Sequence, residues 1–160
     1  MHDLGAVKAE IKLASSDLQT DELLRFVEAA NKGGTVFQLF DHGSVINESH
    51  LYAAYLNTIL SFEDKTNIAS KPYIEMLLFT AMTKQINEAI KIAGIKSPRS
   101  FVVFSTDRAT MQEFGRLARL GTFVPKESHV RKIAGRFRIK VRKSINQDIF
   151  MSMAVSRLTV

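Results

Sequence analysis

The sequence contains no cysteine. Disulfide bonds, thiolate nucleophiles, cysteine zinc sites and iron–sulfur clusters are therefore excluded for this chain. Long apolar runs are also missing, since the best one, residues 76–82, is far shorter than the roughly 18 residues that cross a bilayer. The first residues have neither a basic start nor an apolar stretch, so we expect no signal peptide. A reducing cytoplasm fits these features, and we expect a cytoplasmic protein with no membrane contact.

Positive charge is concentrated in the second part of the chain. Residues 1–95 hold 8 Lys and Arg against 12 Asp and Glu, a charge of −4, whereas residues 96–160 hold 14 against 4, a charge of +10, and the two sum to +6. A basic surface can bind a polyanion, because attraction to phosphates dominates non-specific nucleic-acid affinity. The alternative is a generally basic protein without such a partner.

Length and patterning predict one domain over residues 1–160, with a small mixed β-sheet and helices packed around it, of the α/β (α+β) class. Apolar periodicity predicts the elements. Strands are expected over residues 6–13, 35–40 and 101–104, and helices over 20–30, 48–62, 72–93 and 108–120. Ser16 and Thr20 are possible N-caps of the first helix, and Asp107 of the last. The pattern leaves open whether the third helix breaks at Thr83.

Two segments place cations on one side of an element. On the predicted helix over residues 108–120, Arg108, Arg116 and Arg119 lie within about 80° of one another at 100° per residue. As a strand, residues 136–142 would present cations on one face and apolar side chains on the other. The residues predicted to bind RNA are Arg108, Arg116, Arg119, Arg136, Arg138, Lys140, Arg142 and Lys143. A charge run is equally well explained as a solvated face.

No catalytic constellation is visible in the sequence. The four histidines lack metal-binding spacing, and Gly33-Gly34 lacks the spacing of a dinucleotide or phosphate loop. Asp41 and His42 could be half of a nucleophile-activating pair, but adjacent residues at a strand end point apart. We therefore expect no catalytic residues, no metal and no cofactor. A small-molecule enzyme on an α/β domain and a structural adaptor with an incidental basic face remain alternatives.

The order of several short motifs between residues 36 and 105 is more distinctive than the composition. These are Asp41-His42-Gly43, His50-Leu51-Tyr52-Ala53-Ala54, Asn67-Ile68-Ala69-Ser70, Ile74-Glu75-Met76-Leu77-Leu78, Lys84-Gln85-Ile86-Asn87-Glu88-Ala89-Ile90 and Gly94-Ile95-Lys96. This order resembles the small subunit of the KEOPS complex, the PRPK-binding protein family. Where that family often has a glycine before its basic-Gln-Ile element, this chain has Ala81-Met82-Thr83.

The resemblance implies a non-catalytic subunit of the machinery that makes threonylcarbamoyladenosine at position 37 of tRNA. Such a subunit binds the KEOPS kinase/ATPase subunit, contacts the other subunits indirectly, and recruits tRNA through its 3′ CCA tail. Four residues match the family pattern and are candidates for a polar pocket that receives the tail: His50, Asn67, Lys84 and Gln85. Capping and helix-surface packing are the alternative roles of these residues.

A dense apolar group near the C-terminus is a candidate kinase-binding surface. It consists of Ile149, Phe150, Met151 and Met153. Flexible methionines suit adaptable contacts, although completion of the core would explain the group equally well.

Overall fold

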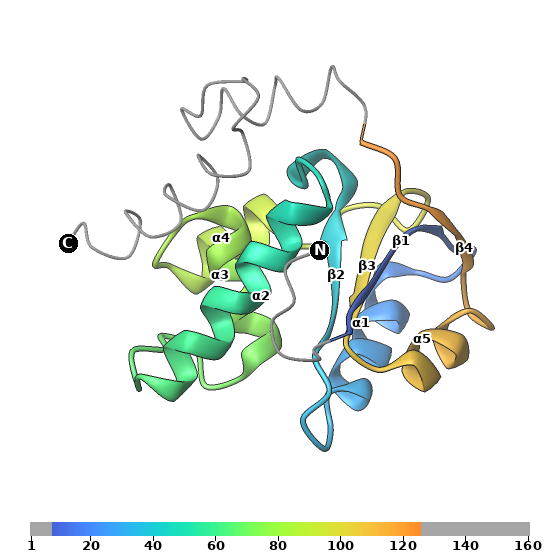
Figure 1. The fold of residues 1–160 in the computed structure, drawn as a ribbon. Coiled ribbons are helices and arrows are strands. Elements are labelled where there is room, and N and C mark those ends of the chain that lie inside the picture. The colour runs from blue at the N-terminus through green and yellow to red at the C-terminus, as the bar shows by residue number, and fades with distance from the viewer. Residues whose placement is uncertain (1–7, 126–160) are drawn as a thin grey trace. The chain divides into compact units, whose positions relative to one another are not determined.

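The computed structural model describes residues 8–125 of the chain (Figure 1). Its elements, in chain order, are β1 (Glu10–Ser15), α1 (Thr20–Ala30), β2 (Phe37–Asp41), the 3₁₀ turn η1 (His42–Ser44), α2 (Glu48–Glu63), α3 (Pro72–Ala81), α4 (Ile86–Ala93), β3 (Phe101–Ser105), α5 (Arg108–Phe114) and β4 (Arg119–Thr122). Contacts divide the chain into two compact units. Within the described residues, the sheet unit comprises residues 8–42 and 95–123, and the helical unit comprises residues 43–94.

The sheet has the strand order β2-β3-β1-β4, and all three pairings are antiparallel. Consequently β1 and β2 run parallel with β3 between them, and β3 and β4 run parallel with β1 between them. Two interleaved split β-α-β units of this kind form the ferredoxin-like arrangement. The predicted class, a small sheet with helices packed around it, is confirmed, and the sheet is antiparallel in each pairing rather than mixed.

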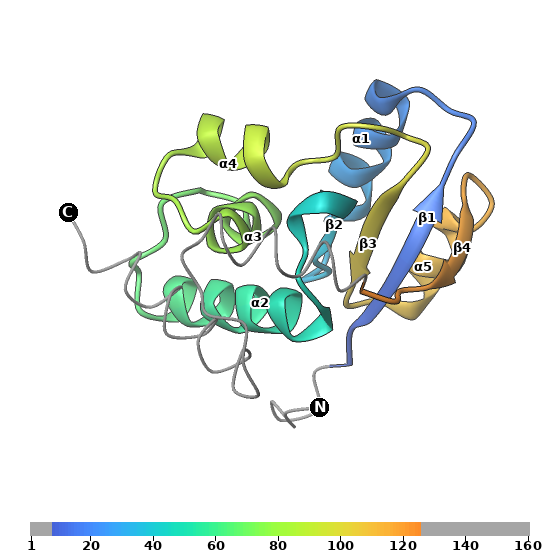
Figure 2. The ribbon, with the colours of Figure 1, turned by 90° about the horizontal axis from the view of Figure 1, so that it is seen from above.

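Helices α1 and α5 lie on the same side of the sheet (Figure 2). Phe26 of α1, Phe37 of β2 and Phe114 of α5 form a triangle of rings with centroids 5.1–5.2 Å apart. Phe101 of β3 adds a fourth ring 6.1 Å from Phe114. Edge-to-face and tilted aromatic contacts at these distances stabilise a core beyond the apolar area that they bury. Strand β3 is buried over its whole length, as the continuous apolar run at residues 101–104 predicts.

The N-terminal caps of α1 and α5 can be compared with those predicted from the sequence. Helix α1 is capped by Gln19, not by Ser16 or Thr20, and the backbone N–H of Gln19 donates to Glu22 (2.9 Å). Asp107 caps α5 as predicted, because its carboxylate accepts from the backbone N–H of Thr110 (3.0 Å).

The prediction of a helix reaching residue 120 is wrong. Helix α5 ends at Phe114, and the chain turns and continues as β4. The apolar spacing of Leu117 and Leu120 suits a helix, but Leu120 instead pairs with Ala14 in the sheet. Non-local strand pairing therefore overrides the helical periodicity of this segment.

In the helical unit, α3 lies between α2 and α4 (Figure 2). Helix α3 begins at Pro72 as predicted, and all its residues from Glu75 to Ala81 are buried. The open question at Thr83 is resolved as a break, since Met82 adopts the left-handed conformation (φ 54°, ψ 45°) and α4 starts at Ile86. The entry and exit of this unit are joined by a hydrogen bond from Ser44 Oγ to the carbonyl of Ile92 (2.5 Å).

Candidate nucleic-acid interface

The predicted basic helix face does not exist as one surface, because α5 is too short to carry it. Arg108 is the first residue of α5, beside the C-terminal end of β3. Arg116 lies in the turn that follows α5, and Arg119 begins β4. All three side chains are exposed, but Arg108 is at the opposite end of the sheet from the other two.

Two further cations join Arg116 and Arg119 at their end of the sheet. At this end of the sheet β1 and β2 end, and β3 and β4 begin. Phe101 at the start of β3 pairs with Ala14 near the end of β1 and with Asp41 at the end of β2, and Arg119 at the start of β4 pairs with Ser15. The loop that enters β3 carries Lys96 and Arg99, both exposed. We call the four residues the basic rim: Lys96, Arg99, Arg116 and Arg119.

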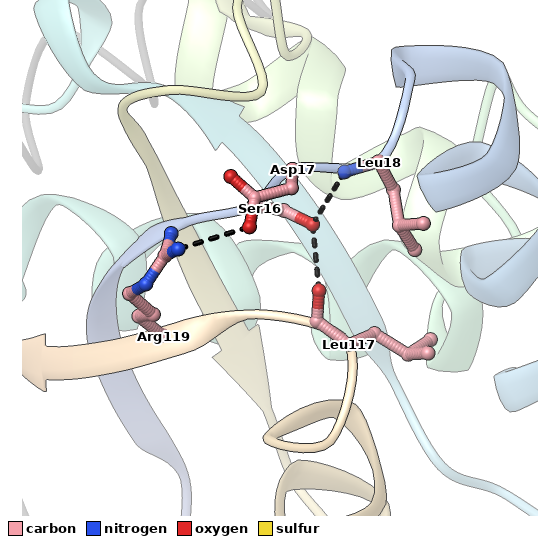
Figure 3. Close-up of polar contacts among 5 residues, drawn as sticks. All are labelled: Ser16, Asp17, Leu18, Leu117 and Arg119. Carbon is pink, nitrogen blue, oxygen red and sulfur yellow. Dashed lines mark hydrogen bonds and ion pairs between the residues drawn. The ribbon is translucent and has the colours of Figure 1, made fainter.

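A buried serine fixes the backbone that carries the rim (Figure 3). Ser16 Oγ donates to the carbonyl of Leu117 (2.6 Å) and accepts from the backbone N–H of Leu18 (3.1 Å). The backbone N–H of Ser16 donates to the carbonyl of Pro98 (2.7 Å). One residue at the end of β1 therefore holds both segments of the rim, residues 96–99 and 116–119.

Two rim cations have carboxylate partners at the surface. Arg119 lies 2.9 Å from Asp17, with the two side chains 70% and 83% exposed (Figure 3). Lys96 lies 3.3 Å from Asp41, with exposures of 51% and 21%. The Arg119–Asp17 pair is exposed on both sides and such a pair contributes about 0–1 kcal/mol, so a phosphate can replace Asp17 at little cost. The rim thus offers four cations against two acids.

Asp41 and His42 take separate partners, as their adjacent positions at the strand end predict. Asp41 pairs with Lys96, whereas His42 Nδ1 lies 3.0 Å from Ser100 Oγ. The His42 ring packs edge-on to Phe123, with centroids 6.2 Å apart. The result is a serine–histidine contact beside the rim.

The predicted pocket of His50, Asn67, Lys84 and Gln85 is not formed. His50 is fully buried: its Nδ1 accepts from the backbone N–H of Ile46 (3.1 Å) and its Nε2 donates to the carbonyl of Thr80 (3.0 Å). Burial lowers the pKa of His50 from 6.5 to about 4. The side chain is therefore a neutral part of the core, and its assignment to a tail-binding surface is wrong.

The other three pocket candidates lie at opposite ends of α3. Asn67 is in the loop before this helix, and its Nδ2 donates to the carbonyl of Ala69 (2.9 Å). Lys84 and Gln85 lie in the link between α3 and α4. Ten helical residues span about 15 Å, so the three side chains cannot surround one nucleotide.

Sequence reasoning missed Ser16, Lys96 and Arg99 as parts of a site. No local signal marks them, because the rim exists only through the pairing of β4 with β1 and of β3 with both its neighbours.

Nine other predicted residues lie outside the described residues. They are the remaining RNA-binding candidates, Arg136, Arg138, Lys140, Arg142 and Lys143, and the kinase-binding group of Ile149, Phe150, Met151 and Met153. The excess positive charge is also outside them, since residues 8–125 hold 13 Lys and Arg against 13 Asp and Glu.

Residues 8–125 contain no group of three or more His, Asp and Glu side chains arranged to hold a metal ion. Within the same range, no helix has the length and apolar character needed to cross a membrane.

Comparison with known proteins shows a distant similarity to an enzyme. No known protein-family profile matches the chain. Over 113 residues, 71% of the chain, it is 29% identical to the 2-succinyl-5-enolpyruvyl-6-hydroxy-3-cyclohexene-1-carboxylate synthase of Arthrobacter sp. strain FB24. The matched region is 18% of the synthase, so the chain spans less than a fifth of that enzyme's length.

Proposed function

We propose that the protein is a cytoplasmic, non-catalytic subunit of a KEOPS-type complex. In this role it binds the kinase/ATPase subunit and recruits tRNA, whose 3′ CCA tail it contacts, for threonylcarbamoyladenosine synthesis. The observation that carries the RNA-binding part is the basic rim, where Lys96, Arg99, Arg116 and Arg119 are exposed at one end of the sheet. Cations that separate segments bring together at one end of the sheet are suited to bind a phosphate backbone.

Two of the motifs behind the KEOPS resemblance hydrogen-bond to each other, and a third bonds to the end of α3. His50, from the motif on α2, binds the carbonyl of Thr80 at the end of α3. The backbone N–H groups of Ile68 and Ala69 donate to Glu75, which belongs to the next motif (3.1 and 2.8 Å). These contacts join residues of the resemblance within one helical unit, which supports the proposal separately from the basic rim.

The partial similarity to a synthase favours an enzyme as the second candidate function. The contact between His42 Nδ1 and Ser100 Oγ (3.0 Å) is the feature of the sheet unit closest to a nucleophile and its base. Turnover of a small acyl or enolpyruvyl substrate, lost on Ser100→Ala replacement, would support this candidate over the first.

Salt-dependent tRNA binding tests the proposed function. Replacing Arg116 and Arg119 together with alanine removes up to two phosphate contacts. The slope of log K against log salt should then fall by about 1.4, at about 0.7 per contact with single-stranded RNA. The affinity should fall along with the slope.

A matched control is available at the other end of the sheet. Arg108 begins α5 at that end. Lys32 lies there too, because the preceding residue, Asn31, hydrogen-bonds to the backbone of Phe37 at the start of β2. The Arg108→Ala and Lys32→Ala double variant should bind tRNA as the unmodified protein does. Equal losses in both double variants would show that the rim is not the site, and a protein that binds neither tRNA nor the kinase subunit would refute the proposal.

A further inference from the structure

One cation of the basic rim is bound to a carboxylate that lies just beyond the end of β1. Arg119 Nη2 is 2.9 Å from Asp17 Oδ2, although the two residues are 102 positions apart in the sequence (Figure 3). The side chains are 70% and 83% exposed, so both partners are open to solvent. An anion from solution can therefore approach Arg119 without any rearrangement of the core.

The backbone around Asp17 keeps its carboxylate beside Arg119. Ser16 Oγ donates to the carbonyl of Leu117, on the segment that carries Arg119, and accepts from the backbone N–H of Leu18. The residues before and after Asp17 are thus bonded together, and the first of them is bonded to that segment. A charged group tethered beside its partner acts as a competitor at a high effective concentration.

The second ion pair of the rim differs, because its carboxylate is largely buried. The side chain of Asp41 is 21% exposed, whereas that of Asp17 is 83% exposed. Asp41 also belongs to β2, where it is in register with Phe101 of β3. Of these two acids, Asp17 is the one that a ligand in solution can readily separate from its cation.

A backbone phosphate can bind Arg119 more strongly than Asp17 does. The contact with Asp17 joins one guanidinium nitrogen to one carboxylate oxygen. A phosphate group can accept two parallel hydrogen bonds from one guanidinium, and such bidentate pairs are the stronger ones. An RNA strand also brings further phosphates to the other rim cations. A polyanion is therefore able to displace Asp17, but it must break the ion pair to do so.

We propose that Asp17 is an internal competitor for RNA at the basic rim, occupying on Arg119 the position that a backbone phosphate takes. This inference rests on the proposed function and assigns a regulator of the same site. Asp17 holds the affinity of the rim for RNA below the value that the four cations would otherwise give. The effect is modest, because an exposed ion pair is weak: removing its negative charge should strengthen RNA binding by about 2- to 5-fold.

The test is a double-mutant cycle in which tRNA affinity is measured at one fixed salt concentration. Asp17→Asn keeps the shape of the side chain and removes its charge, so it should give the full gain. In the Arg119→Ala background the same change should have no more effect than a matched control. The control is Glu28→Gln, which removes one negative charge from an exposed side chain in the last turn of α1. Asn31, which follows α1, bonds to Phe37 at the start of β2, so Glu28 lies toward the end of the sheet opposite the rim.

The other results separate this inference from the proposed function. An equal gain with and without Arg119 would overturn the inference, because it would reveal a general effect of net charge. A gain from Asp17→Asn no larger than that from Glu28→Gln, with salt-dependent tRNA binding intact, would also overturn it and would leave the proposed function standing. If the unmodified protein does not bind tRNA, the proposed function fails and the inference fails with it.

Discussion

The sheet unit and the helical unit build their interiors from different chemistry. Aromatic rings from α1, β2, β3 and α5 fill the sheet unit, and the ion pairs Lys96–Asp41 and Arg119–Asp17 lie at its surface. The helical unit buries more polar side chains, including His50, Thr58, Ser61, Glu75 and Thr80, which bond to backbone groups or to each other. The buried polar side chains of the sheet unit are fewer: Ser16, Gln38 and Ser105. The sheet unit can therefore vary its surface charge at little cost to stability, whereas the helical unit depends on each buried bond.

The largest expected effect is in the aromatic interior. Phe114 contacts three other rings, so Phe114→Ala should lower the free energy of unfolding by about 3–5 kcal/mol. Because no charge is involved, the loss should be the same at pH 5 and pH 7 in urea titrations. A loss that changes strongly between these pH values would contradict the apolar description of this interior.

The next effect is specific to the helical unit and depends on pH. The folded pKa of His50 is about 4 and its ordinary value is 6.5, so between these values the unfolded chain binds more protons than the folded one. Stability is therefore greatest above pH 6.5 and falls as the pH drops toward 4, by up to about 3 kcal/mol at about 1.4 kcal/mol per pKa unit.

A variant without the imidazole isolates this contribution. His50→Gln should show a smaller loss of unfolding free energy between pH 7 and pH 4.5 than the unmodified protein, because carboxylates contribute equally to both. Identical pH profiles would mean that His50 is not the buried neutral group described above.

The smallest expected effect concerns the link between α3 and α4. Met82 has φ 54°, a left-handed conformation that costs a side chain about 1 kcal/mol or more and glycine almost nothing. Met82→Gly should raise the free energy of unfolding by about 0.5–1 kcal/mol. Thr83→Gly, at a neighbouring position outside the positive-φ residues, should give no such gain, and equal effects of the two changes would remove the conformational explanation.

Local signals in the sequence predicted most elements but not their assembly. Pro72 at the start of α3, the cap at Asp107 and the buried run of β3 depend on residues close in sequence, and all three are confirmed. The end of α5 was missed because Leu120 pairs with Ala14, a partner that no periodicity reveals.

The candidate site was predicted less well than the fold for the same reason. Arg116 and Arg119 were identified, but on a helix face, and Lys96 and Arg99 join them only through strand pairing. A histidine on α2 has the same sequence pattern whether it faces solvent or the core. The partners Ile46 and Thr80, which place His50 in the core, come from different elements.

The bond between Ser44 and Ile92 has a consequence for the order of folding. The chain leaves β2 at residue 41 and reaches β3, its neighbour in the sheet, only at residue 101. If the intervening chain were flexible, closing it would cost roughly 3 kcal/mol more than closing a two-residue hairpin, at about 0.6 kcal/mol per doubling of length. Once the helical unit has formed, Ser44 and Ile92 are already together, so β2 and β3 are joined by a folded connection whose ends are close to each other. Formation of the three helices should therefore precede and accelerate the insertion of β3 between its two neighbours.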